Sequence, residues 1–281
     1  MSKIVGVHGV GQQFKGENIL CAEWLPALKD GMARAGCSLV NDDDFSSAFY
    51  GDLFRPSGKS IMDPPYDASD VTDMWEKDML QLWLQEVESL DTLAPGSRKR
   101  SKIRFSSVTQ RALDFLSQSR FFAGIAERGL IYDLKQVRRY LQEKDVRHKV
   151  IGRVQRAIKK DTSVVIAHSL GSIVAYEALC ANPELPVKVF ITIGSPLGIR
   201  NLIFEALMPK PIEDMGVWPL NVEHWINIAD KGDVVALVKK LSLRFGSGVV
   251  DHLVENGSQA HDATRYLTTR ELGNAVKIGY E

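Results

Sequence analysis

Short apolar runs and longer helical patterns follow one another along this chain. Runs of four to seven mostly apolar residues, each closed by a turn former, predict buried strands at residues 4–8, 47–50, 163–167, 187–193, 225–229 and 248–254. Apolar residues that recur at spacings of three and four predict helices at residues 17–35, 71–90, 112–125, 130–158 and 171–179. The pattern at 130–158 is too long for one helix without a break.

Apolar strands that alternate with helices are typical of a parallel sheet covered by helices on both faces. We therefore expect an α/β fold with a mostly parallel central sheet. Residues 55–130 differ, because they are mainly helical and are punctuated by prolines, so we interpret them as a helical cap inserted into the fold. Residues 1–281 then form a single α/β domain that carries this cap.

The composition fits an ordinary globular protein and gives no sign of a nucleic-acid partner. Of the 281 residues, 44% are hydrophobic, and 35 basic side chains balance 35 acidic ones. The chain shows neither a secretory signal pattern nor about 18 uninterrupted apolar residues, so we expect a cytoplasmic protein without a transmembrane segment. The basic run at 98–104 leaves peripheral membrane contact open, and nothing in the sequence indicates an oligomeric state.

The strongest local signal is the string AHSLGS at residues 167–172, which lies between an expected strand and an expected helix. A serine on such a sharp strand-to-helix turn, a nucleophile elbow, exposes its hydroxyl beside the positive end of the helix. This predicts Ser169 as a nucleophile, and a serine that only caps the helix is the alternative. We expect His168 to point away from Ser169, because successive strand residues face opposite sides.

A serine hydroxyl needs a base beside it to act as a nucleophile. In proteins with this elbow, the acid and then the histidine follow the serine along the chain. His224 precedes a strand and His252 falls inside the last one, whereas His261 follows that strand in a turn-rich loop. His261 is therefore the expected base, with His252 as the second choice.

Two aspartates after the strand at 225–229 are candidates to orient this imidazole. Asp230 stands at the strand tip, and Asp233 begins the next element after a glycine turn. Aspartates in such places are also common turn formers. We favour Asp233 and keep Asp230 as the alternative.

Acyl transfer also needs N–H groups aimed at the negative charge that develops on the substrate oxygen. The backbone N–H of Leu170, next to the serine, is one candidate. The loop after the first strand offers Val10 and Gly11, because glycines let the backbone come close to a substrate. This loop lacks both glycine patterns of nucleotide-binding proteins, so we do not expect a nucleotide.

These motifs resemble the lipase and esterase-like branch of the α/β-hydrolase superfamily. The resemblance rests on the HG loop at 8–9, the elbow at 167–172, the GSP turn at 194–196, the DVV string at 233–235 and His261 ahead of Tyr266-Leu267. It covers both ends of the chain but not residues 55–130, and it implies the fold and the serine–histidine–aspartate triad more than a substrate. Ala167 and Val234 depart from the usual glycine and proline without touching a reacting group.

We expect a serine hydrolase that cleaves a carboxylic ester, of a small molecule or an acyl lipid, through an acyl-Ser169 intermediate. The same residues would serve for an amide or a thioester. A catalytically silent scaffold whose cap binds a partner protein is the third interpretation. Metal-ligand spacing is absent from the sequence, its three widely spaced cysteines favour free thiols, and the chemistry needs no cofactor, so we expect neither a metal nor a cofactor.

Overall fold

The structure is a computed structural model in which residues 3–55, 66–92, 108–118 and 127–280 are described. Within these residues, six strands form one sheet in which each neighbouring pair is parallel. The strands are β1 Ile4–Val7, β2 Phe45–Ala48, β3 Val164–His168, β4 Val189–Ile193, β5 His224–Asp230 and β6 Val249–Val254. Each lies where the sequence predicts a strand, with ends that differ by no more than two residues, so the expected α/β fold is confirmed.

The strand order β2-β1-β3-β4-β5-β6 places β1 inside the sheet. The chain moves from β1 outward to β2 and then returns to β3 on the other side of β1. The order therefore reverses between β1 and β3, and the carboxyl ends of strands at such a point are the usual ligand site of open α/β sheets. The segments that follow β1 and β3 line a common cavity here.

Both faces of the sheet are buried, which explains why its strands are continuous apolar runs in the sequence. In β3, Val165 and Ala167 belong to the core on one face, and Val164 and Ile166 belong to the core on the other. Strands with two buried faces are typical of parallel sheets that lie between layers of helices.

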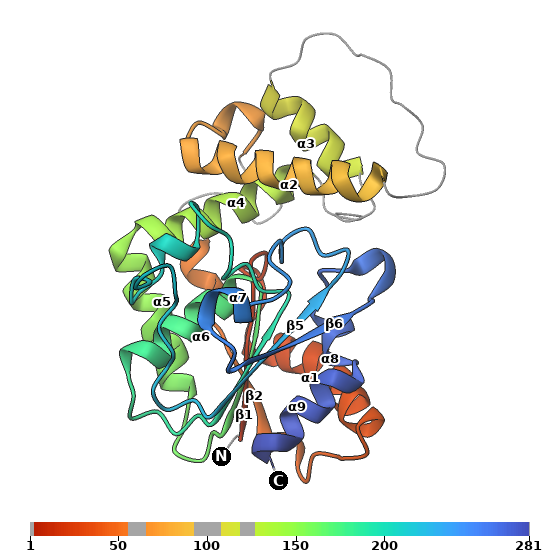
Figure 1. Ribbon diagram of the computed structural model, residues 1–281, viewed down its shortest axis with the longest axis vertical. Coiled ribbons are helices and arrows are strands. Elements are labelled where there is room, and N and C mark those ends of the chain that lie inside the picture. The colour runs from red at the N-terminus through yellow and green to blue at the C-terminus, as the bar shows by residue number, and fades with distance from the viewer. Residues whose placement is uncertain (1–2, 56–65, 93–107, 119–126, 281) are drawn as a thin grey trace.

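Helices cover the two faces of the sheet (Figure 1). One face carries α1 Glu17–Arg34, α8 Ala263–Leu267 and α9 Arg270–Tyr280, and the other carries α5 Lys144–Ala157 and α6 Leu170–Ala181. Helices α1 and α9 meet at two glycines, because a Cβ added at Gly273 would lie 2.2 Å from the carbonyl oxygen of Gly31.

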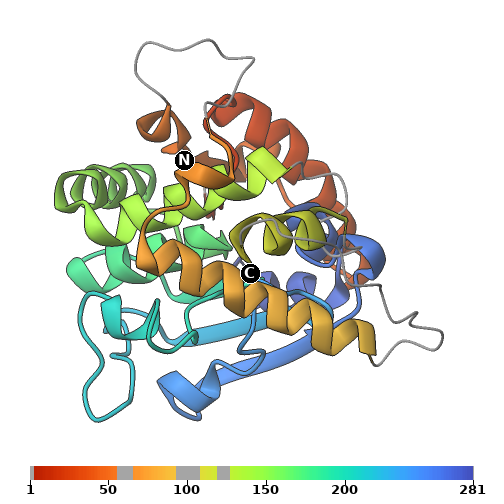
Figure 2. The same ribbon diagram turned by 90° about the horizontal axis from the view of Figure 1, so that it is seen from above.

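A helical insertion between β2 and β3 comprises α2 Met74–Thr92, α3 Val108–Gln118, α4 Glu127–Gln142 and α5. Helices α2, α3 and α4 lie over the carboxyl ends of the strands, as the two ribbon views agree (Figures 1 and 2). The long pattern at 130–158 is broken at Glu143, and the insertion runs past its expected end at residue 130. The basic run at 98–104 and the predicted end of α3 lie outside the described residues.

A buried ion pair joins the insertion to the helices below it. Glu177 of α6 is 1% exposed, and its carboxylate accepts hydrogen bonds from Arg147 Nε of α5 (2.7 Å) and the Tyr140 hydroxyl of α4 (2.6 Å). The backbone N–H of Met208 donates to the same carboxylate at 3.0 Å. Removal of one partner of such a buried pair typically costs about 3–5 kcal/mol, because the other charge is left unpaired. The pair and its hydrogen bonds join α4 and α5 to α6.

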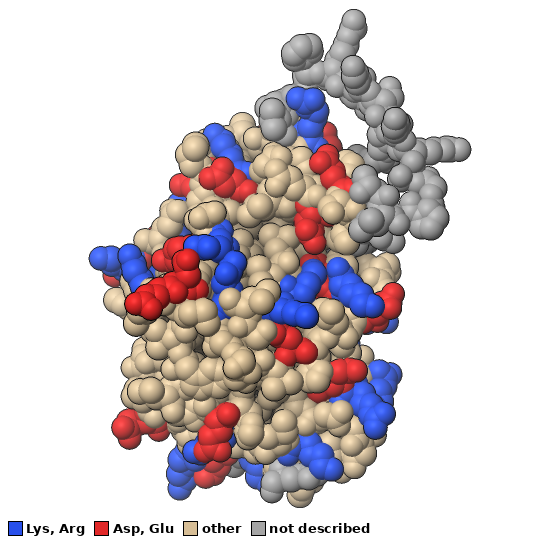
Figure 3. Space-filling model, in the orientation of Figure 1, with Lys and Arg blue, Asp and Glu red and all other residues tan. Residues whose placement is uncertain are grey.

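Charged side chains of both signs are spread over the face of the molecule in Figure 3, in keeping with the equal numbers of 35 basic and 35 acidic residues. In the part of the chain that the structure describes, the helices are all too short or too polar to cross a membrane.

The glycine contact between α1 and α9 leads to a stability prediction. Gly273→Ala should lower the free energy of unfolding by about 1–3 kcal/mol, because the new methyl group would overlap the carbonyl oxygen of Gly31 and force the helices apart. Gly152→Ala in α5 is the matched control: its Cβ would meet only the flexible end of Arg156 at 3.3 Å, so we expect a small gain in stability. Urea unfolding of both variants measures the difference, and equal midpoints would contradict the prediction.

Candidate active site

Ser169 lies on a strained turn between β3 and α6. Its backbone angles are φ 53° and ψ −128°, which a residue with a side chain adopts only where the surrounding structure enforces it. The Ser169 N–H donates to the carbonyl of Ile193 at 3.2 Å, and a Cβ at Gly171 would lie 2.4 Å from the carbonyl oxygens of Val7 and His8. Gly171, two residues after the serine, is therefore needed to seat α6 against the end of β1.

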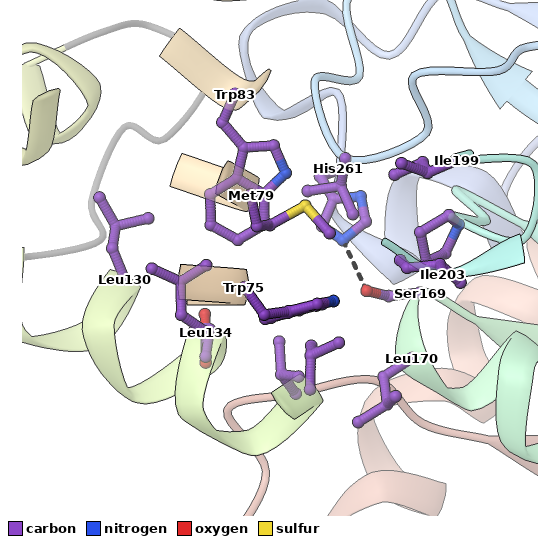
Figure 4. A pocket seen from close by; sticks show the side chains of 15 residues that line it. Trp75, Met79, Trp83, Leu130, Leu134, Ser169, Leu170, Ile199, Ile203 and His261 are labelled. Atoms are coloured by element: carbon purple, nitrogen blue, oxygen red, sulfur yellow. Dashed lines mark hydrogen bonds between the residues drawn. The ribbon is translucent and has the colours of Figure 1, made fainter. Parts of the chain in front are cut away.

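The structure brings together the three residues predicted as a triad. Ser169 Oγ lies 3.0 Å from His261 Nε2, and His261 Nδ1 lies 2.8 Å from Asp233 Oδ2 (Figure 4 marks the first of these hydrogen bonds). An ionised carboxylate can only accept hydrogen bonds, so the His261 proton belongs on Nδ1. Nε2 is then free to accept the hydroxyl proton of Ser169, which is the arrangement that a general base needs.

Asp233 is fully buried, yet it is held as a carboxylate. Burial by itself raises the pKa of Asp233, but the charge and hydrogen bond of His261 outweigh it, and with Lys239 and Tyr266 they hold this pKa well below its usual range. The Tyr266 hydroxyl donates to Oδ2 at 2.7 Å, and Oδ1 accepts the N–H of Val235 at 2.9 Å. The sequence marks Tyr266 only as part of the YL pair, and its contact with the acid is a finding of the structure.

The alternative acid and the other downstream histidines do not take part in this chain of hydrogen bonds. The Asp230 carboxylate accepts the N–H of Gly232 at 2.6 Å and the N–H of Asn256, so it shapes the turns that follow β5 and β6. His252 lies within β6. His224 is exposed at the amino end of β5, whereas the serine lies at the carboxyl ends of the strands. Asp230, His224 and His252 thus form no hydrogen bond with Ser169, whose imidazole partner is His261.

The loop after β1 lies directly beside the serine. A Cβ at Gly9 would be 2.8 Å from Ser169 Cβ, and Gly11 has φ +75°, a conformation that favours glycine. Val10 and Ser169 line the same cavities, and Leu170 is the first residue of α6, where a backbone N–H has no partner inside the helix. Val10, Gly11 and Leu170 are therefore close to the nucleophile, and their role as donors to an oxyanion stays a prediction.

Two buried histidines shape this region without belonging to the triad. His168 Nε2 donates to the backbone oxygen of His261 at 2.8 Å, and the two rings lie 4.6 Å apart. His8 donates from Nδ1 to the carbonyl of Gly9 at 2.7 Å and accepts the N–H of Tyr50 at 3.2 Å. Burial lowers the pKa of His168 to about 3 and that of His8 to about 4, so both rings are neutral. We expected His168 only to point away from Ser169, so its hydrogen bond to the backbone of His261 was not foreseen.

Two cavities of different chemistry meet at Ser169. The smaller, of about 60 Å³, lies under α2 and α4 and is almost entirely apolar (Figure 4). Its apolar walls include Trp75, Met79, Trp83, Leu134, Ile199 and Ile203. The larger, of about 530 Å³, opens toward the loops after β1 and β6, and its lining mixes polar and apolar groups. Because it is the more polar of the two, we call it the polar cavity.

Four described residues line both cavities: Val10, Asp133, Ser169 and His261. Asp133, on α4, was not among the residues singled out from the sequence. The signal was present, because residues 130, 133, 134 and 137 share one helix face, and Asp133 is the only acid among them. A carboxyl group on an otherwise apolar stripe points to a polar requirement within a binding site.

Searches of family models, curated proteins and solved structures find no match to the chain. Among the described residues, histidine, cysteine, aspartate and glutamate side chains do not gather in threes or more where they could hold a metal ion.

The two neutral histidines predict how stability depends on pH. In the unfolded chain, histidine binds a proton as the pH falls below about 6.5, whereas folded His168 stays neutral down to about pH 3. The free energy of unfolding should therefore fall as the pH is lowered from about 6.5 toward 3, because the unfolded chain binds a proton at His168 and the folded protein does not. His168→Gln, which keeps a donor for the His261 carbonyl, should reduce the slope by up to about 1.4 kcal/mol per pH unit. Urea unfolding at a series of pH values measures the slope, and an identical slope in the variant would contradict the assignment.

Proposed function

We propose that this protein is a serine hydrolase with the α/β-hydrolase fold that cleaves carboxylic esters through an acyl-Ser169 intermediate. The observation that carries the proposal is the continuous chain of hydrogen bonds from Ser169 Oγ through His261 to buried Asp233. It lies at the carboxyl ends of parallel strands, with the serine on a strained strand-to-helix turn. The order of the three residues along the chain supports the same conclusion.

The proposed reaction proceeds in two halves. Ser169 Oγ attacks the ester carbonyl while its proton moves to His261 Nε2, and Asp233 stabilises the imidazolium that results. The carbonyl oxygen becomes an oxyanion, for which the N–H groups of Leu170 and Val10 or Gly11 are the nearby candidates. The imidazolium returns its proton to the leaving alcohol, and an acyl group remains on Ser169. His261 then takes a proton from water, whose oxygen attacks the acyl carbon. The imidazolium returns this proton to Ser169 Oγ as the bond between Oγ and the acyl carbon breaks, which releases the acid and restores the free serine.

The cavities support an ester with one apolar and one polar side. We place the acyl group in the narrow apolar cavity and the alcohol side in the larger polar cavity, because their linings match these two parts of an ester. Amides and thioesters pass through the same intermediates, so they belong in the same substrate panel.

Replacement of the nucleophile tests the proposal directly. Ser169→Ala should lower kcat for p-nitrophenyl butyrate by at least about 10⁴-fold, and it should abolish labelling by a fluorophosphonate probe. Ser247→Ala is the matched control, since Ser247 is an exposed serine on the loop before β6. It should keep both the rate and the label. Wild-type protein that neither reacts with the probe nor hydrolyses any ester, amide or thioester would overturn the proposal.

Met79 leads to a prediction about the length of the acyl group. It is 1% exposed on α2 and lines the apolar cavity, whereas its neighbour Leu80 is equally buried and does not. Met79→Ala should enlarge the cavity and move the preferred p-nitrophenyl ester to a longer chain. Leu80→Ala should lose a similar amount of stability, about 2–5 kcal/mol, without changing the preference. A profile of kcat/KM against chain length that is the same in both variants would contradict this placement of the acyl group.

A further inference from the structure

Asp133 differs from the other residues that line both cavities. Val10, Ser169 and His261 belong to the candidate reaction machinery, and Asp133 has no place in it. Its carboxyl group faces the loop after β1, because a Cβ added at Gly11 would lie 3.6 Å from Asp133 Oδ1. The side chain therefore stands opposite the nucleophile, at the border between the apolar and the polar cavity.

None of the described residues forms a hydrogen bond or an ion pair with this carboxyl group. Lys15 is the one lysine or arginine among the described residues that line the polar cavity, and its ammonium group is paired with Glu23 at 2.6 Å. The Asp262 carboxylate, in the same cavity, is used to cap α8 through the N–H of Thr264 at 2.8 Å. Asp133 is partly exposed to the cavities and not fully buried, so its carboxyl group, which has no partner among the described residues, is open to a group on a bound molecule.

A structural role does not account for an acid at this position. Its neighbours on the same helix face are Leu130, Leu134 and Val137, which pack under α2, and a leucine would continue that apolar wall. Burial raises the pKa of Asp133 to about 7, partly offset by the charge of His261. Near neutral pH, the free protein thus keeps a partly protonated carboxyl group at a position whose neighbours form an apolar wall.

We propose that Asp133 is a specificity-determining residue that accepts a hydrogen bond from a donor group, a hydroxyl or an ammonium, on the alcohol side of the ester. The inference rests on the proposed function and names its substrate class: esters of polyols or amino alcohols. The acyl group occupies the apolar cavity, the scissile carbonyl lies at Ser169, and the donor on the leaving alcohol meets Asp133 as it enters the polar cavity. An alcohol without a donor leaves this carboxyl group unsatisfied, and a site built around a hydrogen bond rejects such an analogue strongly.

Two pairs of butyrate esters with matched shapes test the inference. In the first pair, 1-butyrylglycerol carries hydroxyl groups where 2-methylbutyl butyrate carries methyl groups. In the second pair, 2-(dimethylamino)ethyl butyrate carries a protonated amine where 3-methylbutyl butyrate carries a CH group. Wild-type protein should favour the donor-bearing member of at least one pair by about tenfold or more in kcat/KM, and the pair that responds identifies the donor.

Substitutions of the acid supply the second arm of the experiment. Asp133→Leu should bring the ratio within the responding pair close to one. Asp133→Asn, which keeps an acceptor oxygen but loses the charge, should preserve more of a hydroxyl preference than of an ammonium preference. Asp161→Asn is the control, since Asp161 is exposed at the amino end of β3, and it should keep the wild-type ratio.

Ratios near one in both pairs of wild-type protein would overturn the inference, as would a wild-type ratio that survives in Asp133→Leu. Fluorophosphonate labelling of Ser169 separates this failure from failure of the proposed function. A protein that labels and turns over esters but shows flat ratios retains the hydrolase proposal and loses the role of Asp133. A protein that does neither loses both.

Discussion

The buried carboxylate of Asp233 is the charge around which the rest of the site is arranged. A carboxylate without solvent is costly unless donors surround it, and here those donors come from separate parts of the chain. The imidazole of His261, the hydroxyl of Tyr266 and the backbone N–H groups of Val235 and Ala236 all point at it. Because these contacts also fix the tautomer of His261, the buried charge determines which ring nitrogen faces Ser169.

The surrounding structure holds this arrangement with groups that remain neutral. His168 supports the backbone of His261, and His8 fixes the loop beside the serine, and both have lost their tendency to protonate through burial. The Tyr266 hydroxyl also accepts the N–H of Asp230, so the two neighbouring aspartates are linked through one side chain. His8 and His168 thus stay neutral beside His261, the histidine that takes up the proton in the proposed reaction.

The helical insertion gives the site its two different sides. Helices α2 and α4 form an apolar wall over the ends of the strands, whereas the loops after β1 and β6 leave a polar opening. The ion pair of Glu177 and Arg147 holds the base of this insertion against α6, the helix that follows the nucleophile. The same insertion that closes the apolar cavity therefore also carries Asp133, which lines both cavities.

Much of this could be predicted from the sequence, because it follows from local patterns. Continuous apolar runs predicted the strands of a sheet buried on both faces, and the AHSLGS string between a strand and a helix predicted the elbow. The choice of His261 over His252 also followed from local pattern, since a residue inside a strand points across the sheet and not over its ends. Asp233 was favoured over Asp230 without a decisive local reason, because both follow a strand and both are suited to turns.

Only the tertiary structure shows which of those aspartates meets the imidazole. It also shows that Tyr266 bonds to Asp233 and that His168 bonds to the backbone of His261. These contacts join residues separated by 28 to 93 positions in the chain, and they depend on the strand order and on loop paths that local periodicity does not encode. The role of Asp133 is similar: the sequence shows an acid on an apolar helix face, but only the packing of α4 over the strand ends places it opposite Ser169. Periodicity fixes which face of an element is buried, whereas the meeting of distant side chains is fixed by how those faces pack together.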